Sequence, residues 1–162
     1  MAAAWPATPH PMIPTCNLSP QPFRWVMLDS MTDFQLMTRL AADTFPIADW
    51  KLSRVLLMND RRYPWVVLVP RRAGAVELFD LSEADRIVLM EEIAEASTRL
   101  KGDAAKINVG ALGNLVPQLH VHVVARNPGD PAWPGPVWGH SPAVPYDEDE
   151  REALIWKFVN AR

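Results

Sequence analysis

Two of the four histidines, His120 and His122, lie two residues apart in the stretch Pro-Gln-Leu-His-Val-His-Val-Val at 117–124. The β-branched valines favour a half-buried strand, and successive side chains of a strand alternate between its two faces. Gln118, His120 and His122 would then share one face, while Leu119 and the alternating valines would pack on a core. The sequence therefore predicts a sheet face that carries two imidazoles and one amide.

Three interpretations of this face are open. The default for a His-x-His pair in a strand is a polar surface whose imidazoles are satisfied by hydrogen bonds. A metal site is the second, because imidazole is the commonest metal ligand. Even an open zinc site needs about three ligands, however, and Cys16, His10 and His140 are remote in sequence. The third is nucleophilic catalysis, because an imidazole with a pKa of about 6.5 is partly neutral at pH 7 and can attack phosphorus.

A glycine-containing loop, Asn-Val-Gly-Ala-Leu-Gly-Asn-Leu-Val-Pro at 108–117, leads into the histidine stretch. Gly110 and Gly113 would serve either a hairpin that needs positive φ or a loop whose backbone N–H groups approach a phosphate. The pattern Gly-x-x-x-x-Gly-Lys-Ser/Thr is absent, so the loop is not a P-loop.

These motifs, in this order, resemble the histidine triad family. Residues 118–124 are similar to its signature His-φ-His-φ-His-φ-φ, with Gln118 in place of the first histidine. The loop at 108–117 is similar to the one that precedes the triad, and residues 56–59 with 64–70 look like the family's nucleotide-binding hairpin. Trp133-Pro134 is similar to the Trp-Pro tail of some members. The resemblance covers roughly residues 34 to 140.

The resemblance implies a nucleotide phosphohydrolase in which His120 attacks the α-phosphorus and water then hydrolyses the nucleotidyl-imidazole. His122, Asn114 and loop amides would stabilise charge. The backbone carbonyl of Gln118 would fix the tautomer of His120, whereas its side chain cannot carry charge or transfer a proton. The resemblance requires neither metal nor cofactor.

The resemblance also implies substrate contacts. Asn59 would accept a ribose hydroxyl, Asn108 and Asn114 would donate to the α-phosphate or the bridging oxygen, and the loop at Gly113 would approach a phosphate. Trp65 departs from members that carry histidine at this place. It further implies a homodimer that binds a purine nucleotide or adenylyl substrate.

Candidate substrates are dinucleoside polyphosphates, nucleoside phosphoramidates and other adenylyl conjugates, and the family favours pyrophosphate-type bonds. The alternative from another class is a non-catalytic nucleotide-binding protein in which Gln118 marks lost activity. A metal-binding protein that uses His120 and His122 ranks third.

The flanking sequence predicts the elements that position these residues. A capping box, Thr32 with Gln35, begins a helix that carries Phe34, Met37 and Leu40 and ends before Pro46. Strands are predicted at 23–28, 50–59, 65–69 and 105–109, with a turn at 60–64. The long helix begins at the N-cap Ser82 and ends at Gly102, with a buried stripe of Ile87, Met90, Ala94, Ser97 and Leu100, and Ile93 beside it. A C-terminal helix follows acidic residues 147–150 and would bury Leu154, Ile155, Phe158 and Val159.

These elements predict an α+β domain with roughly five mostly antiparallel strands and two main helices packed on the apolar face, which resembles the histidine triad fold. The chain divides into a Pro-rich leader at 1–22, a domain at 23–146 with a Pro- and Trp-rich tail, and a C-terminal helix at 147–162 on the same domain. The tail contains Trp133 and Trp138, so we expect it to pack against the rim of the site or a partner subunit.

Composition excludes several classes. The chain has 162 residues, 49% hydrophobic and 22% charged, and a net charge of −3, which gives no electrostatic footprint for nucleic acid. One cysteine cannot form an internal disulfide. The sequence contains no run of about 18 apolar residues, so it predicts no membrane span, and no signal-peptide pattern is visible. We therefore expect a cytoplasmic protein that binds neither nucleic acid nor membrane.

Overall fold

The structure, a computed structural model, describes residues 34–161. The predicted leader at 1–22, the predicted strand at 23–28 and the predicted N-cap Thr32 lie outside the described residues.

Five strands form one antiparallel sheet in the order β1-β2-β3-β5-β4. Their bounds are β1 Thr44–Asp49, β2 Ser53–Met58, β3 Trp65–Pro70, β4 Lys106–Gly110 and β5 Val121–Arg126. The described part of the chain has three helices, α1 Thr38–Asp43, α2 Glu83–Lys101 and α3 Glu148–Asn160, and a short 3-10 turn at Leu78–Asp80. The predicted α+β class and antiparallel sheet are confirmed.

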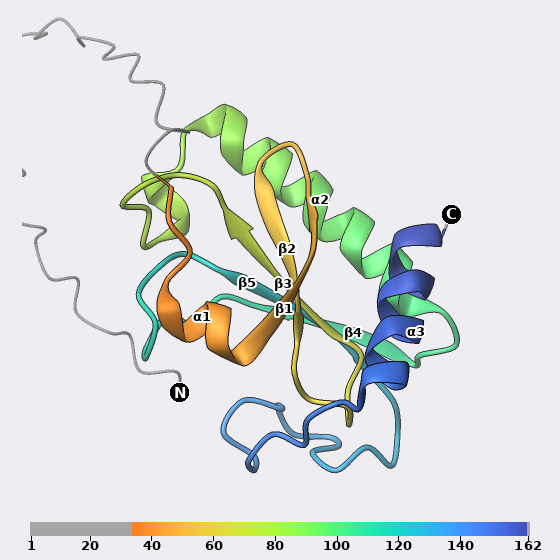
Figure 1. Cartoon of the computed structure of the whole chain (residues 1–162). Helices are drawn as coiled ribbons and strands as arrows, with labels where there is room; N and C mark the ends of the chain where they lie inside the picture. Colours follow the sequence, from red (N-terminus) through yellow and green to blue (C-terminus); the bar gives the residue numbers. More distant parts are fainter. Residues whose placement is uncertain (1–33, 162) are drawn as a thin grey trace, which may run out of the picture.

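The two long helices pack on one face of the sheet (Figure 1). Leu89, Ala96 and Leu100 of α2 and Phe158 of α3 share a core with Val121 and Val123 of β5 and with apolar residues of β2 and β3. The opposite face carries a second core, to which α1 contributes Leu40 and the segment after β5 contributes Ala132 and Val137. The prediction of two main helices on one face is therefore confirmed, and the histidines belong to the other face.

The first part of the described chain differs from the prediction. α1 begins at Thr38, with Met37 as an N-cap that makes no side-chain hydrogen bond, so Phe34 precedes the helix. Pro46 does not follow a long helix but lies in the edge strand β1, where the register shifts between Pro46 and Ala48. A proline is tolerated at such an edge and bulge because no ladder partner needs its missing N–H.

The predicted buried stripe of α2 is only partly confirmed, because Leu100 is buried and Ile93 packs against the core but the first positions of the stripe are exposed. Ile87 and Met90 are 60% and 63% exposed, and the buried positions are Leu89, Glu92, Ala96 and Leu100. The cause is Glu92, whose carboxylate enters the core side and accepts hydrogen bonds from the backbone N–H groups of Leu52 (2.7 Å) and Ser53 (3.1 Å). Because Glu92 is charged, the sequence pattern placed this face in solvent and assigned the neighbouring face of the helix to the core.

Both helix caps of the prediction are confirmed. Ser82 accepts a hydrogen bond from the N–H of Asp85, and Gly102 follows α2 with a positive φ. Asp147 caps α3 and forms a capping box with Glu150. On α3, Phe158 is buried as predicted, but Val159 is exposed.

Candidate active site

The histidine stretch is only partly a strand. β5 begins at Val121, so Gln118 and His120 lie in the segment that enters it. The valines at 121 and 123 belong to the helix-side core, as the alternation predicted, while His122 lies on the other face. The rings of His120 and His122 lie 4.8 Å apart and nearly perpendicular.

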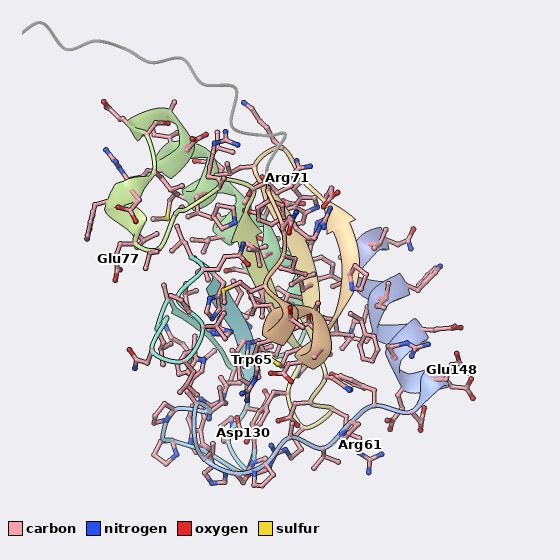
Figure 2. The ribbon with its side chains drawn as sticks, turned by 60° about the vertical axis from the view of Figure 1, so that its left-hand side comes forward. Arg61, Trp65, Arg71, Glu77, Asp130 and Glu148 are labelled. Carbon is pink, nitrogen blue, oxygen red and sulfur yellow. The ribbon has the colours of Figure 1, made fainter. Side chains whose placement is uncertain are left out.

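Both imidazoles line a cavity of about 460 Å³. One wall comes from β3 through Trp65, another from the loop at 112–116, and a third from residues 137–143 of the tail. A second hollow of about 110 Å³ shares His120 and residues 112–114 with the cavity and adds Glu77. Figure 2 shows Trp65 in the interior, Glu77 on the segment before α2 and Asp130 on the segment after β5. His120 therefore lies where a larger apolar hollow meets a smaller one.

His120 has a defined tautomer. Its Nδ1 lies 2.7 Å from the backbone carbonyl oxygen of Gln118, which is the hydrogen bond that the sequence predicted. A carbonyl oxygen only accepts, so Nδ1 carries the proton and Nε2 retains its lone pair in the neutral ring. The nearly buried ring, 7% exposed, thus has one free nucleophilic nitrogen.

His122 lies among aromatic rings. Its Nδ1 is 3.0 Å from the indole nitrogen of Trp65, and the ring of Trp138 lies 5.8 Å away. Burial, with the nearby His120 as a second cause, lowers the pKa of His122 to about 3. His122 is therefore neutral near pH 7.

The side chain of Gln118 is not part of the cavity wall. Its Oε1 accepts from the N–H of Met37 (2.9 Å), and its Nε2 donates to the carbonyl of Gln35 (2.8 Å). Leu119 lies in the helix-side core as the alternation predicted, but the Gln118 side chain, although it points away from that core, lines neither hollow. The amide instead holds the segment before α1 against the entry to β5.

The four predicted substrate contacts divide into two pairs. Gly113, with a φ of +69°, and Asn114 line both hollows. Asn59 and Asn108 line neither. The Oδ1 of Asn59 accepts from the N–H of Tyr146 (3.0 Å), and that of Asn108 accepts from Arg126 (2.9 Å). Both amides therefore hold backbone or side chains in place outside the cavity.

Gly110 serves a close approach rather than a positive φ. A Cβ at this position would lie 3.1 Å from the Cη2 atom of Trp138. The absence of a side chain on β4 thus lets the indole of Trp138 lie against the sheet beside His122. The prediction that the tail packs on the rim of the site holds for Trp138, which lines its own chain's cavity.

One carboxylate lines the cavity. Asp60 is 3% exposed, and Arg62 donates to both of its oxygens, at 2.8 and 2.6 Å. Burial would raise the pKa of Asp60, but the hydrogen bonds from Arg62 and Val144 outweigh it and hold the pKa below the usual value. Among residues 34–161, no lysine or arginine lines either hollow.

Sequence reasoning missed Trp65, Asp60 and Val137 as cavity residues. Trp65 carried a signal, since it replaces the histidine of some family members, but its contact with His122 depends on the pairing of β3 with β5. Within the described residues, no group of three or more histidine, cysteine, aspartate or glutamate side chains could hold a metal ion. No described helix is long and apolar enough to cross a membrane.

Comparison with known proteins identifies a domain family and similar solved structures. Residues 39–129 match the model of the HIT domain. A histidine triad protein of Sinorhizobium meliloti has 47% identity and a TM-score of 0.80, covering 82% of this chain and 99% of that one. One from Bradyrhizobium japonicum has 47% identity and a TM-score of 0.78, covering 79% and 97%. One from Marinobacter aquaeolei has 48% identity and a TM-score of 0.74, covering 76% and 92%. None of the curated proteins matches the chain.

Proposed function

The chain belongs to the HIT domain family, and on this premise we propose that it hydrolyses nucleotides through a nucleotidyl-histidine intermediate on His120. Family membership supports nucleotide binding or hydrolysis in general. The observation that carries the finer proposal is the 2.7 Å hydrogen bond between His120 Nδ1 and the Gln118 carbonyl. This bond leaves the lone pair of Nε2 free, on a ring that lines the cavity.

The reaction has two displacements at phosphorus. The lone pair of His120 Nε2 attacks the α-phosphorus, and the bond to the leaving group breaks with its electron pair going to the leaving group. Water then attacks the same phosphorus, the P–N bond breaks and returns its pair to Nε2, and one proton passes to solvent. The net reaction consumes one water and releases a nucleoside monophosphate.

We expect the larger cavity to receive the nucleoside and the smaller hollow, of about 110 Å³, to receive only the first phosphate on the other side of the bond that breaks. The larger cavity is walled by Met58, Val137 and Trp138 and suits a nucleoside, whose base is largely apolar on its faces. The loop at Gly113 and Asn114 lies between the hollows, where the α-phosphate would sit beside His120.

The protonation of the site favours a weakly basic leaving group. His122 is neutral with a pKa of about 3, and Arg62 keeps Asp60 ionised, so neither holds a proton ready for transfer at neutral pH. A phosphate or carboxylate leaves as an anion without a proton, whereas an amine needs one. This supports phosphoric anhydrides, such as dinucleoside polyphosphates or related adenylyl conjugates, over phosphoramidates.

The test is incubation with diadenosine tetraphosphate or adenosine phosphoramidate, followed by mass spectrometry for an acid-labile adenylyl adduct. We expect AMP release with the adduct on the peptide that contains His120, faster from the anhydride. His120→Ala should lower turnover at least about a thousand-fold. The matched control His140→Ala, at an exposed histidine outside the cavity, should leave turnover unchanged.

Two results would contradict the proposal. AMP binding without adduct or release from either substrate would identify a nucleotide-binding protein instead. Turnover that survives in His120→Ala would exclude His120 as the nucleophile.

A further inference from the structure

Trp65 makes one polar contact whose direction is fixed by chemistry. Its Nε1 lies 3.0 Å from His122 Nδ1, and both side chains are nearly buried, at 7% and 6% exposure. An indole N–H donates and cannot accept. Nδ1 of His122 must therefore offer its lone pair, and the single proton of the neutral imidazole must be on Nε2.

This arrangement is the reverse of that at His120. The Gln118 carbonyl places the proton of His120 on Nδ1, whereas the Trp65 indole places the proton of His122 on Nε2. The two rings lie 4.8 Å apart at an interplanar angle of 83° and line the same cavity. His120 thus has a free lone pair on Nε2, whereas His122 has a free N–H on Nε2.

From this contact we infer that Trp65 is a positioning residue, which locks His122 in the Nε2–H tautomer so that it donates a hydrogen bond to the phosphoryl group attacked by His120. The inference deepens the proposed function and rests on it. A donor fixed in a water-poor site needs no reorganisation as negative charge develops on the phosphoryl oxygens. Because an indole N–H donates and cannot accept a hydrogen bond, the contact also keeps the lone pair of His122 on Nδ1, directed at Trp65 and away from the substrate.

The charged groups around His122 are compatible with this role. The titratable side chains in the cavity wall, within residues 34–161, are His120, His122 and Asp60. Asp60 is held by Arg62, and burial lowers the pKa of His122 to about 3. His122 is therefore a neutral donor throughout the ordinary pH range and not an imidazolium.

Trp65 also packs in a core, so the test needs a measurement that a change in packing alone would not alter. Its indole packs in the core that holds Tyr63, Val67 and Val137. The ring ¹⁵N chemical shifts of His122 report directly which nitrogen carries the proton, in the full chain and without substrate. We expect an unprotonated Nδ1 and a protonated Nε2 in the native protein.

The variant is Trp65→Phe, which keeps an aromatic ring and removes the N–H. We expect a mixture of His122 tautomers, and a kcat for diadenosine tetraphosphate that is about ten- to a hundred-fold lower with little change in KM, because the donated bond strengthens in the transition state. The control Trp133→Phe changes an indole that lies outside the cavity and should alter neither the tautomer nor kcat.

Three outcomes would overturn the inference: an Nδ1–H tautomer in the native protein, an unchanged tautomer in Trp65→Phe, or an unchanged kcat in that variant. The native spectrum decides the tautomer even if Trp65→Phe fails to fold. If the native protein hydrolyses no nucleotide, the proposed function fails by itself, and the spectrum still shows whether Trp65 sets the tautomer.

Discussion

At the scale of single residues, the site depends on two imidazoles that differ only in their partners. His120 meets a carbonyl, which accepts, and His122 meets an indole, which donates. In the proposed function, the same side chain would therefore serve as the nucleophile at position 120 and as a hydrogen-bond donor at position 122. Neither role requires a charged imidazole, which suits a cavity with largely apolar walls.

The burial of His122 predicts a pH-dependent stability. Its pKa is about 3 in the folded chain, against an ordinary value of 6.5. Between these values the unfolded chain binds the proton and the folded chain does not, so the free energy of unfolding should fall as the pH falls below about 6.5. The slope should approach about 1.4 kcal/mol per pH unit.

Urea unfolding between about pH 7.5 and 5 measures this slope, above the range in which the aspartates with lowered pKa values contribute. His122→Asn should flatten the curve, since its amide oxygen can still accept from Trp65. The exposed His140→Asn should keep the native slope. A native curve that is already flat, or a slope that survives in His122→Asn, would contradict the assignment.

At the scale of elements, the register of three strands assembles the site. In the β3–β5 pair, Val67 lies opposite His122 and Trp65 lies opposite Val124. Trp65 is therefore a diagonal neighbour of His122, within the reach of a large aromatic side chain. On the other side of β5, Gly110 of β4 lies opposite His122 and leaves room for Trp138.

The contact between α2 and the β1–β2 turn should depend on Glu92. Its carboxylate is the acceptor for two buried backbone N–H groups, those of Leu52 and Ser53. Glu92→Leu would leave both donors without a partner, and we expect it to lower the free energy of unfolding by about 3 kcal/mol. The exposed neighbour Glu91→Leu should change it by less than about 0.5 kcal/mol.

Chemical denaturation of the two variants at the same pH makes the comparison. If Glu92→Leu is as stable as the native protein, Glu92 does not hold the turn. A loss in Glu91→Leu of the same size would instead attribute the effect to the added apolar surface.

The elements show which features a sequence can predict. The long helix, its caps and four of the five described strands follow from periodicity and capping residues, which act locally. β1 was missed because Pro46 reads as a helix stop, although an edge strand with a bulge accommodates it. The stripe on α2 was partly misplaced because Glu92 is buried by partners 40 residues away.

The contacts of the site also divide into local ones, which a sequence can predict, and long-range ones, which it cannot. The His120–Gln118 hydrogen bond joins residues two apart and was predictable. The Trp65–His122 bond joins residues 57 apart, and the attachment of the Gln118 side chain to the segment before α1 joins residues 81 and 83 apart. Such contacts are set by the packing of the sheet and not by local spacing.

At the scale of the whole molecule, the segment after β5 is anchored by Arg126. This side chain is 1% exposed and binds both oxygens of Asp130, the carbonyl of Gly135 and the amide oxygen of Asn108. The hydrogen bonds that Arg126 donates to Asp130 raise the pKa of Arg126 further, so the pair stays ionised. The anchor fixes the path that brings Trp138 back over the site.

The outer face of the molecule leads to the last prediction, the homodimer that the family resemblance implies. Ile87 and Met90 of α2 are more than half exposed, and Val109 of β4 is 47% exposed. Among residues 34–161, β4 is an edge strand, and its outer backbone groups have no ladder partner in that part of the chain. α2 and β4 adjoin, and a second copy of the chain would cover both the apolar side chains and the free edge.

Sedimentation of the full chain should therefore show a dimer, and Met90→Glu should shift it toward the monomer because a buried, unpaired carboxylate is costly at an interface. Trp156→Glu is the matched control, since Trp156 is 69% exposed but lies on α3. If Trp156→Glu dissociates the dimer and Met90→Glu does not, the interface lies on α3. If the native chain sediments as a monomer, the predicted dimer through α2 and β4 is wrong. Because residues of a single chain already form the walls of the cavity around His120 and His122, we expect a monomeric Met90→Glu to retain nucleotide binding, which would separate assembly from chemistry.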